Sequence, residues 1–281
     1  MIGTLYVVST PIGNLEDITL RALRILREAN LIAAEDTRHT RKLLNHFEIN
    51  TPAIAYHEHN KISQLETILE RLKAGEIVAL VSDAGTPCLS DPGWELVKAA
   101  LAQNIIVEAI PGAAAPIVAL VLSGFAPHEF TYVGFAPRKK NELIEWLARL
   151  RNEAERRPLI FFEAPHRLVE TLQIILDTLG DRPIAICREL TKLHEEIRRE
   201  SVQEALEHFK MVEPRGEFTL VLAPSLTNNT SIEQVEINPQ ARLLELKQTG
   251  LRAKEAVELV AKQSGLPRRQ VYELWLKLSG S

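Results

Sequence analysis

The sequence is poor in cysteine, with only Cys88 and Cys187 among its 281 residues. The two are far apart and match no metal or redox spacing, so neither a cysteine metal site nor a redox motif is indicated. No apolar run approaches the roughly 20 residues that a membrane helix needs. The opening segment MIGTLYVVSTPIG has neither the basic flank nor the cleavage site of a signal peptide. Together these absences predict a cytoplasmic protein that does not enter a membrane.

Two site motifs are also missing. No G-x-G-x-x-G follows the first predicted strand, which argues against a standard dinucleotide site. The segment His57-Glu58-His59 has the residue types of a metal site, but no third ligand stands at a standard spacing. We therefore expect no metal here, and a loop before a helix is the simpler interpretation.

The composition is that of an ordinary soluble globular protein, with 46% apolar and 25% charged residues. A chain of this length suits roughly two domains and a large core. The net charge of −4 is uneven, because residues 238–281 carry eight Lys and Arg against four Asp and Glu, which is +4 there and leaves −8 elsewhere. A basic tail indicates a polyanionic partner, although helical tails can be basic for solubility alone.

Strands that alternate with helices predict an α/β fold. Short apolar runs predict five strands in the first part of the chain, at 4–9, 31–34, 53–56, 77–81 and 105–110. Joined by helices, these strands form a parallel sheet covered on both faces. A second series follows, at 130–135, 159–163, 184–188, 197–202 and 218–223.

This pattern divides the chain into four segments. We expect an N-terminal α/β domain at 1–124, a second α/β domain at 125–225, a polar linker at 226–237 and a C-terminal helical domain at 238–281. The first boundary rests on the turn-forming segment Ser123-Gly124-Phe125-Ala126-Pro127. Three short helices in the tail have the size of a helix-turn-helix unit.

The most informative stretch is SDAGTPCLSDPG at residues 82–93, directly after the buried strand at 77–81. Asp83 stands at the carboxyl end of that strand, where ligands bind in open α/β sheets. The small residues of Ala84-Gly85-Thr86-Pro87 let a ligand approach the backbone amides, and the acid can bind an amine or a hydroxyl. A tight strand-to-helix turn without a ligand is the alternative.

Other strands also end in residues suited to chemistry. Strand ends on one side of a sheet form one rim, so we expect these residues to line a common cleft between the two α/β domains. They are Pro11, Gly13, Glu35, Asp36, Arg38, Pro111, Gly112, Phe135, Glu163, His166, Arg167, Arg188 and Glu189.

Several segments, taken in order, resemble one family. TPIGNLEDIT, EDTRHTRKLL, SDAGTPCLSDPG, PGAAAP, FFEAPHR and RGEFTLVLAP are similar to the RsmI family, and the similarity covers essentially the whole chain. These are small-subunit ribosomal RNA 2′-O-methyltransferases of the tetrapyrrole methylase superfamily. The resemblance implies S-adenosylmethionine (SAM) as methyl donor, a cofactor cleft between two α/β domains, and homodimers. The implied substrate is the ribose of a cytidine in the decoding region of 16S rRNA, free or in the 30S subunit.

The resemblance also implies which residues bind the cofactor. Its acidic glycine-rich loop falls on Asp83, Ala84, Gly85, Thr86 and Pro87, and its second loop on Pro111, Gly112, Ala113 and Ala114. The second loop usually carries hydroxyl side chains, whereas this sequence has alanines and offers backbone hydrogen bonds alone. Further cofactor contacts are expected from Pro11, Gly13, Phe135, Glu163, Leu190, Leu222 and Ala223.

Methyl transfer to a ribose 2′-OH needs a donor and a nucleophile held in line, which supplies up to about 7–11 kcal/mol. It also needs the hydroxyl proton to leave. Candidate acids and bases are Asp36, Asp83, Glu163 and His166, with Arg38 or Arg188 as charge stabilisers. Structural ion pairs or helix caps are the alternative for Asp36–Arg38 and Glu163–Arg167. The pattern does not select one base.

Two other functions stay open. A methylase acting on a tetrapyrrole or another small molecule needs neither the basic tail nor the basic clusters at 38–42, 138–140, 156–157 and 268–269. A non-catalytic, RNA-binding ribosome-assembly factor predicts a degraded cofactor loop, yet residues 83–87 are intact. The sequence therefore favours an RNA methyltransferase over both.

Overall fold

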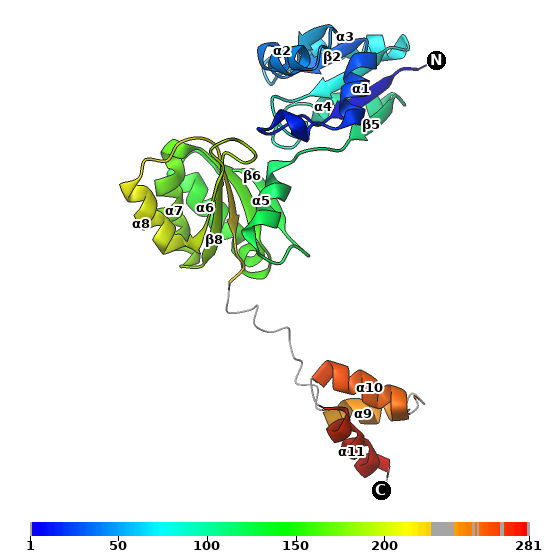
Figure 1. Ribbon diagram of the computed structural model, residues 1–281, viewed down its shortest axis with the longest axis vertical. Coiled ribbons are helices and arrows are strands. Elements are labelled where there is room, and N and C mark those ends of the chain that lie inside the picture. Colours follow the sequence, from blue (N-terminus) through cyan, green and yellow to red (C-terminus); the bar gives the residue numbers. More distant parts are fainter. Residues whose placement is uncertain (1, 226–238, 249–250, 252, 265–266, 280–281) are drawn as a thin grey trace. The chain divides into compact units, whose positions relative to one another are not determined.

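The computed structural model describes residues 2–225, 239–248, 251, 253–264 and 267–279 (Figure 1). The chain divides into two compact units, 1–225 and 226–281. The linker predicted at 226–237 lies outside the described residues. Within the described ranges, no helix has the length and apolar character needed to cross a bilayer.

A five-stranded parallel sheet, the first sheet, organises the N-terminal part of the first unit, as predicted. Its order is β3-β2-β4-β1-β5, so β4 is central and β1 lies beside it. The strands are β1 (Thr4–Val8), β2 (Leu31–Ala34), β3 (Ala53–Ala55), β4 (Ile77–Val81) and β5 (Ile106–Ile110).

Helices cover both faces of the first sheet. Alternate residues of a strand point to opposite faces, so Val81 joins the core under α1 (Leu20–Glu28) and α2 (Thr37–His46), whereas Leu80 joins the core on the other face. That second core is closed by α3 (Lys61–Lys73) and α4 (Trp94–Ala102). Burial on both faces explains why β4 is a continuous apolar run.

The second sheet is mixed. Its order is β6-β7-β10-β8-β9, with β6 and β7 parallel and the other neighbouring strands antiparallel. The strands are β6 (Thr131–Phe135), β7 (Leu159–Glu163), β8 (Pro183–Arg188), β9 (Glu196–Ser201) and β10 (Phe218–Leu222). One face packs against α6 (Lys140–Arg156), α7 (Leu168–Leu179) and α8 (Val202–Met211).

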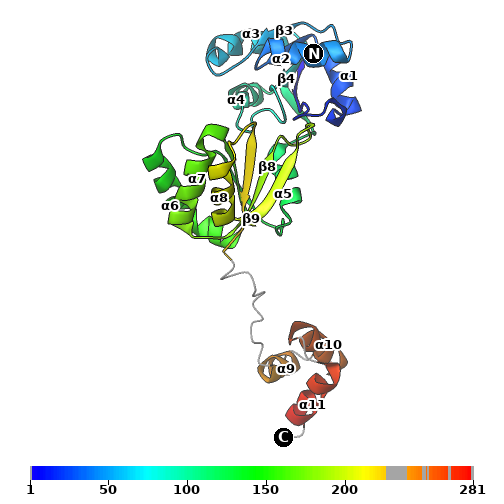
Figure 2. The ribbon, with the colours of Figure 1, turned by 60° about the vertical axis from the view of Figure 1, so that its left-hand side comes forward.

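Helix α5 (Ala115–Ser123) covers the opposite face of the second sheet, which Figure 2 shows clearly. Its buried residues Ala119 and Leu120 share a core with Ile160 and Val221 of that sheet. The boundary predicted at residue 124 assigns α5 to the first domain, whereas the buried residues of α5 pack on the second sheet. Gly124, with φ of 77°, ends the helix in a left-handed turn, and this turn produced the boundary signal.

The C-terminal unit contains three helices among its described residues. They are α9 (Pro239–Gln248), α10 (Ala253–Ser264) and α11 (Arg268–Ser279). Residues from all three form one small core, which includes Leu243, Val257, Val260, Val271 and Trp275.

Candidate active site

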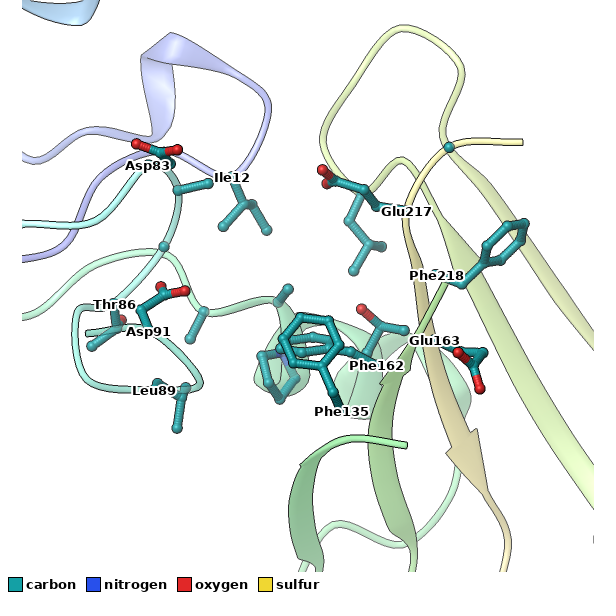
Figure 3. A pocket seen from close by; sticks show the side chains of 18 of the residues that line it. Ile12, Asp83, Thr86, Leu89, Asp91, Phe135, Phe162, Glu163, Glu217 and Phe218 are labelled. Carbon is teal, nitrogen blue, oxygen red and sulfur yellow. The ribbon is translucent and has the colours of Figure 1, made fainter. Parts of the chain in front are cut away.

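A pocket of about 410 Å³ lies inside the first unit, where strand ends of both sheets come together (Figure 3). Pockets of roughly 300–1,000 Å³ are usual for small-molecule ligands. Its lining includes Ile12, Glu35, Asp83, Ala84, Gly85, Thr86, Leu89, Asp91, Ala114, Phe135, Phe162, Glu163, Leu190, Lys192, Gly216, Glu217, Phe218 and Thr219.

The predicted cofactor residues divide into two groups. Those that line the pocket are Asp83, Ala84, Gly85, Thr86, Ala114, Phe135, Glu163 and Leu190. Those outside its lining are Pro11, Gly13, Pro87, Pro111, Gly112, Ala113, Leu222 and Ala223. The central loop at 83–86 therefore lines this pocket, whereas several of the neighbouring predicted residues lie outside its lining.

The loops that follow β1, β4 and β5 are bonded into one rim. Thr10 and Gly85 exchange two backbone hydrogen bonds, of 2.8 and 3.0 Å. The Thr86 hydroxyl lies 3.0 Å from the Ser9 hydroxyl and donates to the carbonyl of Ala113 at 3.1 Å. The Gly85 amide is thus used within the protein, whereas we expected it to face a ligand.

Two predicted cofactor glycines are small because protein segments cross there. A Cβ on Gly13 would lie 2.5 Å from Lys192 Cγ and 2.7 Å from the Leu190 carbonyl oxygen. A Cβ on Gly112 would lie 2.8 Å from Ser9 Cβ. Neither distance is tolerable for a side chain, so these glycines allow close packing behind the pocket.

Three carboxylates, Glu35, Asp83 and Asp91, form what we call the acidic wall of the pocket. Asp83 accepts a hydrogen bond from the backbone N–H of Asp36 at 3.0 Å, and its own N–H donates to Glu35 at 3.3 Å. Burial raises the pKa of Glu35 above its ordinary value. Burial, with the charges of Glu35 and Asp83, raises the pKa of Asp91 to about 6.

Asp36 and Arg38 lie outside this pocket's lining. Asp36 caps α2 by accepting the Arg38 N–H at 2.8 Å, and its other oxygen pairs with the Arg38 guanidinium at 2.7 Å. The hydrogen bonds from Arg38 hold the pKa of this carboxyl well below its usual range. The helix cap and ion pair named as the alternative are therefore what the structure contains.

Glu163 and His166 are two further predicted catalytic residues. Glu163 is 3% exposed and accepts hydrogen bonds from Thr171 at 2.5 Å and Arg167 at 3.1 Å. His166 is exposed and lies in a separate groove beside α6, α7 and α8, with Lys140 and Lys210. Glu163 thus holds the end of β7 in place, and His166 is not part of the pocket.

Strand direction explains the misplacement of Leu222 and Ala223. Strand β10 runs antiparallel to β7, so Phe218 pairs with Glu163 at the pocket while Leu222 pairs with Leu159 at the far end. The residues of β10 that line the pocket are Phe218 and Thr219, at its start.

Phe135 and Phe162 form the aromatic wall, opposite the acidic wall (Figure 3). Their ring centroids are 5.1 Å apart, and Phe135 is 63% exposed, so it presents apolar surface to the pocket. Two hydrogen bonds join the two sides of the pocket. They connect the Ser90 and Tyr132 hydroxyls at 2.6 Å, and the Asn14 N–H with the Thr191 hydroxyl at 3.0 Å.

Several lining residues were not predicted as cofactor contacts. Leu89 and Asp91 belong to the SDAGTPCLSDPG stretch, so the motif contained the signal. Lys192 lies 3.2 Å from Glu189 and 3.3 Å from Glu217, in a charged pair of loops that follow β8 and precede β10. Nothing in the local sequence pattern marks these loops as neighbours.

Known proteins share this fold and parts of this sequence. Residues 4–206 match the family of Tetrapyrrole (Corrin/Porphyrin) Methylases, and residues 238–279 match the RsmI C-terminal HTH domain. Solved structures share the fold at low sequence identity. Uroporphyrin-III C-methyl transferase from Thermus thermophilus, complexed with S-adenyl homocysteine, is 21% identical with a TM-score of 0.54 over 78% of this chain and 97% of that one. Diphthine synthase is 15% identical with a TM-score of 0.60 over 79% and 90%.

The pocket is built by one parallel and one mixed sheet, and the chain matches this family over most of its length. The protein is therefore a methyltransferase of the tetrapyrrole methylase class. This bears out the predicted fold class and SAM as the cofactor. Within the class, the chain belongs to the ribosomal RNA small subunit methyltransferase I (RsmI) family.

Two full-length relatives support this assignment. The protein of that name from Synechocystis sp. is 46% identical over 98% of both chains. The one from Halalkalibacterium halodurans is 44% identical over 97% of this chain and 94% of that one.

Proposed function

We propose that this chain transfers a methyl group from SAM to the ribose 2′-hydroxyl of a cytidine in the decoding region of 16S rRNA. Membership of the small-subunit rRNA methyltransferase family supports the class of RNA. The 2′-oxygen, the cytidine and its position in the rRNA are the finer parts of the proposal. A ribosomal RNA substrate places the reaction in the cytoplasm.

The residues of the pocket fit SAM. Phe135, Ile12 and Leu190 offer apolar surface for the adenine ring and the methylene groups. Within the acidic wall, Glu35 and Asp83 offer negative charge for the sulfonium and ammonium groups. When bound, SAM supplies an electrophilic methyl group that a hydroxyl oxygen can attack.

The observation that carries the proposal is the pairing of the acidic wall with the aromatic wall across one pocket. The hydrogen-bonded rim around Gly85 and Thr86 fixes the acidic wall before any ligand enters. Such preorganised groups lose little entropy on binding and hold the reactants in line.

Basic side chains close to this rim favour RNA over a small-molecule substrate. Arg38, Arg41 and Lys42 are exposed on α2, whose first turn is bonded through the Asp36 N–H to Asp83. A phosphate backbone is attracted to such a cluster. A tetrapyrrole-type substrate would need no positive surface beside the pocket.

The test is methyl transfer from labelled SAM, with 30S subunits, free 16S rRNA and a uroporphyrinogen offered in parallel. Nuclease digestion and mass spectrometry then locate the label. We expect 2′-O-methylcytidine at one decoding-region position. A methylated base would overturn the proposed chemistry, and a labelled tetrapyrrole would overturn the proposed substrate. Sedimentation equilibrium on the same preparation tests the homodimer that we also expect.

A further inference from the structure

We propose that Asp91 is the general base of this reaction. As the ribose oxygen attacks, the O–C bond forms, the C–S bond breaks with its electron pair left on sulfur, and the hydroxyl proton moves to an Asp91 carboxylate oxygen and then to water. The assignment rests on the proposed function, because a ribose hydroxyl is the acceptor whose proton must leave.

The first reason is that the other pocket acids hold the structure together. Glu163 binds Thr171 and Arg167 and is buried. Glu217 pairs with Lys192. Each of these two carboxylates is therefore paired with a cationic side chain of the fold.

The other two acids of the acidic wall are bonded to the backbone. Asp83 accepts the Asp36 N–H, and Glu35 accepts the Asp83 N–H, so both lock the loops that follow β2 and β4. Among the residues described, the pocket lining includes no histidine. Asp91 is half-buried and faces the aromatic wall (Figure 3).

The second reason is the strained backbone that delivers Asp91. Within six residues, Cys88, Ser90 and Gly93 have φ values of 70°, 67° and 136°. Left-handed residues other than glycine are costly and cluster at functional sites. A Cβ on Gly93 would lie 2.7 Å from Leu80 Cδ2, so the loop is packed tightly against β4. The Ser90–Tyr132 hydrogen bond fixes its other side to the second sheet.

The third reason is electrostatic. Asp91 is surrounded by Glu35 and Asp83 from the acidic wall, Cys88 from its own loop and Tyr132 from β6. Burial and the two carboxylates raise its pKa to about 6, and the Ser82 hydroxyl partly opposes the rise. A carboxylate with a pKa close to the working pH takes a proton more readily than an ordinary one.

The decisive variant is Asp91→Asn, which keeps the shape of the side chain and removes its ability to take a proton. We expect kcat on 30S subunits to fall about 100- to 10,000-fold, the usual contribution of a general base. We expect the affinity for S-adenosylhomocysteine, measured by calorimetry, to change less than about threefold, which is well under 1 kcal/mol. Asp177→Asn, on α7 outside this pocket, is the matched control and should keep wild-type kcat.

Two readouts do not depend on turnover. In the free wild-type protein, the aspartate ¹³Cγ signal that Asp91→Asn removes should titrate near pH 6. The charged form is disfavoured in the fold, so stability falls as pH rises from the ordinary aspartate pKa to the raised one. Asp91→Asn should therefore raise the melting temperature at pH 8 relative to wild type, but not at pH 4. A residue with a purely structural role would lower it at both.

The outcomes separate the two proposals. If the wild-type enzyme methylates a base, the proposed function fails whatever the variant does. If it makes 2′-O-methylcytidine and Asp91→Asn keeps its kcat, the assignment of Asp91 fails alone. An equal loss of S-adenosylhomocysteine affinity and kcat would make Asp91 a cofactor ligand, which also overturns its role as base.

Discussion

The two sheets build the pocket in different ways. In the first sheet all strands are parallel, so the loops after β1, β2 and β4 meet at one edge. Backbone hydrogen bonds between Thr10 and Gly85, and the bond from the Asp36 N–H to the Asp83 carboxylate, tie these loops together. The second sheet is mixed, so its side of the pocket combines the ends of β6 and β7 with the start of β10. The first sheet contributes fixed charge, and the second contributes mainly apolar and aromatic surface.

This difference indicates that the two sides of the pocket have different functions. Charge must be held rigidly to act on a sulfonium or a proton, and a bonded rim does that. Apolar contact tolerates small shifts, because dispersion and burial are not directional. Substitutions on the two sides of the pocket should therefore have different effects. Depending on where the side chain lies, they should lower the free energy of unfolding, weaken cofactor binding, or remove a hydrogen bond between the two sides.

The largest effect is expected at the end of β10 away from the pocket. Leu222→Ala removes a fully buried side chain and should cost about 2–5 kcal/mol of unfolding free energy. Because Leu222 pairs with Leu159 and not with the pocket end of β7, affinity for S-adenosylhomocysteine should stay at the wild-type value below the unfolding transition. Urea unfolding and calorimetry on one preparation measure both. A stable variant that binds weakly would contradict this view of β10.

The acidic wall should show the next largest effect. Asp83→Ala removes a charge that lines the pocket and the acceptor of the Asp36 N–H. A charged hydrogen bond is worth about 1.5–3 kcal/mol, so S-adenosylhomocysteine should bind about 100-fold more weakly by calorimetry. Asp83→Asn keeps an acceptor for the rim and should lose less. Unchanged affinity in Asp83→Ala would remove the acidic wall from the cofactor site.

The aromatic wall should show a smaller loss of affinity. Stacking of a base on an aromatic ring is worth about 1–3 kcal/mol, so Phe135→Ala should weaken S-adenosylhomocysteine binding about tenfold. Because Phe135 is 63% exposed, its removal should leave the melting temperature almost unchanged. Phe130→Ala, an exposed phenylalanine outside the pocket lining, is the control. Equal affinities for the two variants would show that the ring does not contact the cofactor.

The smallest effect concerns the connection between the two sides. Tyr132→Phe deletes the hydrogen bond to Ser90 and should cost about 0.5–1.5 kcal/mol of unfolding free energy. Ser90→Ala deletes the same bond, so the double variant should cost less than the sum of the single ones. Strict additivity would mean that the two hydroxyls do not interact in solution.

The same contrast explains what could be predicted from sequence. Parallel strands joined by helices place all their carboxyl ends at one edge of the sheet. Asp83, Ala84, Gly85 and Thr86 could therefore be predicted as pocket residues from their position after one apolar run. The parallel direction of the strands in the first sheet was predicted from the local alternation of strands and helices. The order of its strands and their register needed the coordinates.

The second sheet could be predicted less well. Local pattern identifies β10 as a strand but not its direction, so Leu222 and Ala223 were assigned in place of Phe218 and Thr219. Glu163 does end β7 as expected, yet its role is set by Thr171 and Arg167 on the following turns. Asp91 was inside the quoted motif, but the left-handed residues that direct it are visible only in the fold.

The central claim is that the acidic wall and the aromatic wall hold one SAM molecule together. The most direct measurement is a crystal structure of the chain with S-adenosylhomocysteine. We expect the ligand to contact both the Asp83–Thr86 loop and Phe135. Ligand density that touches only one of the two walls, or lies outside this pocket, would contradict the account.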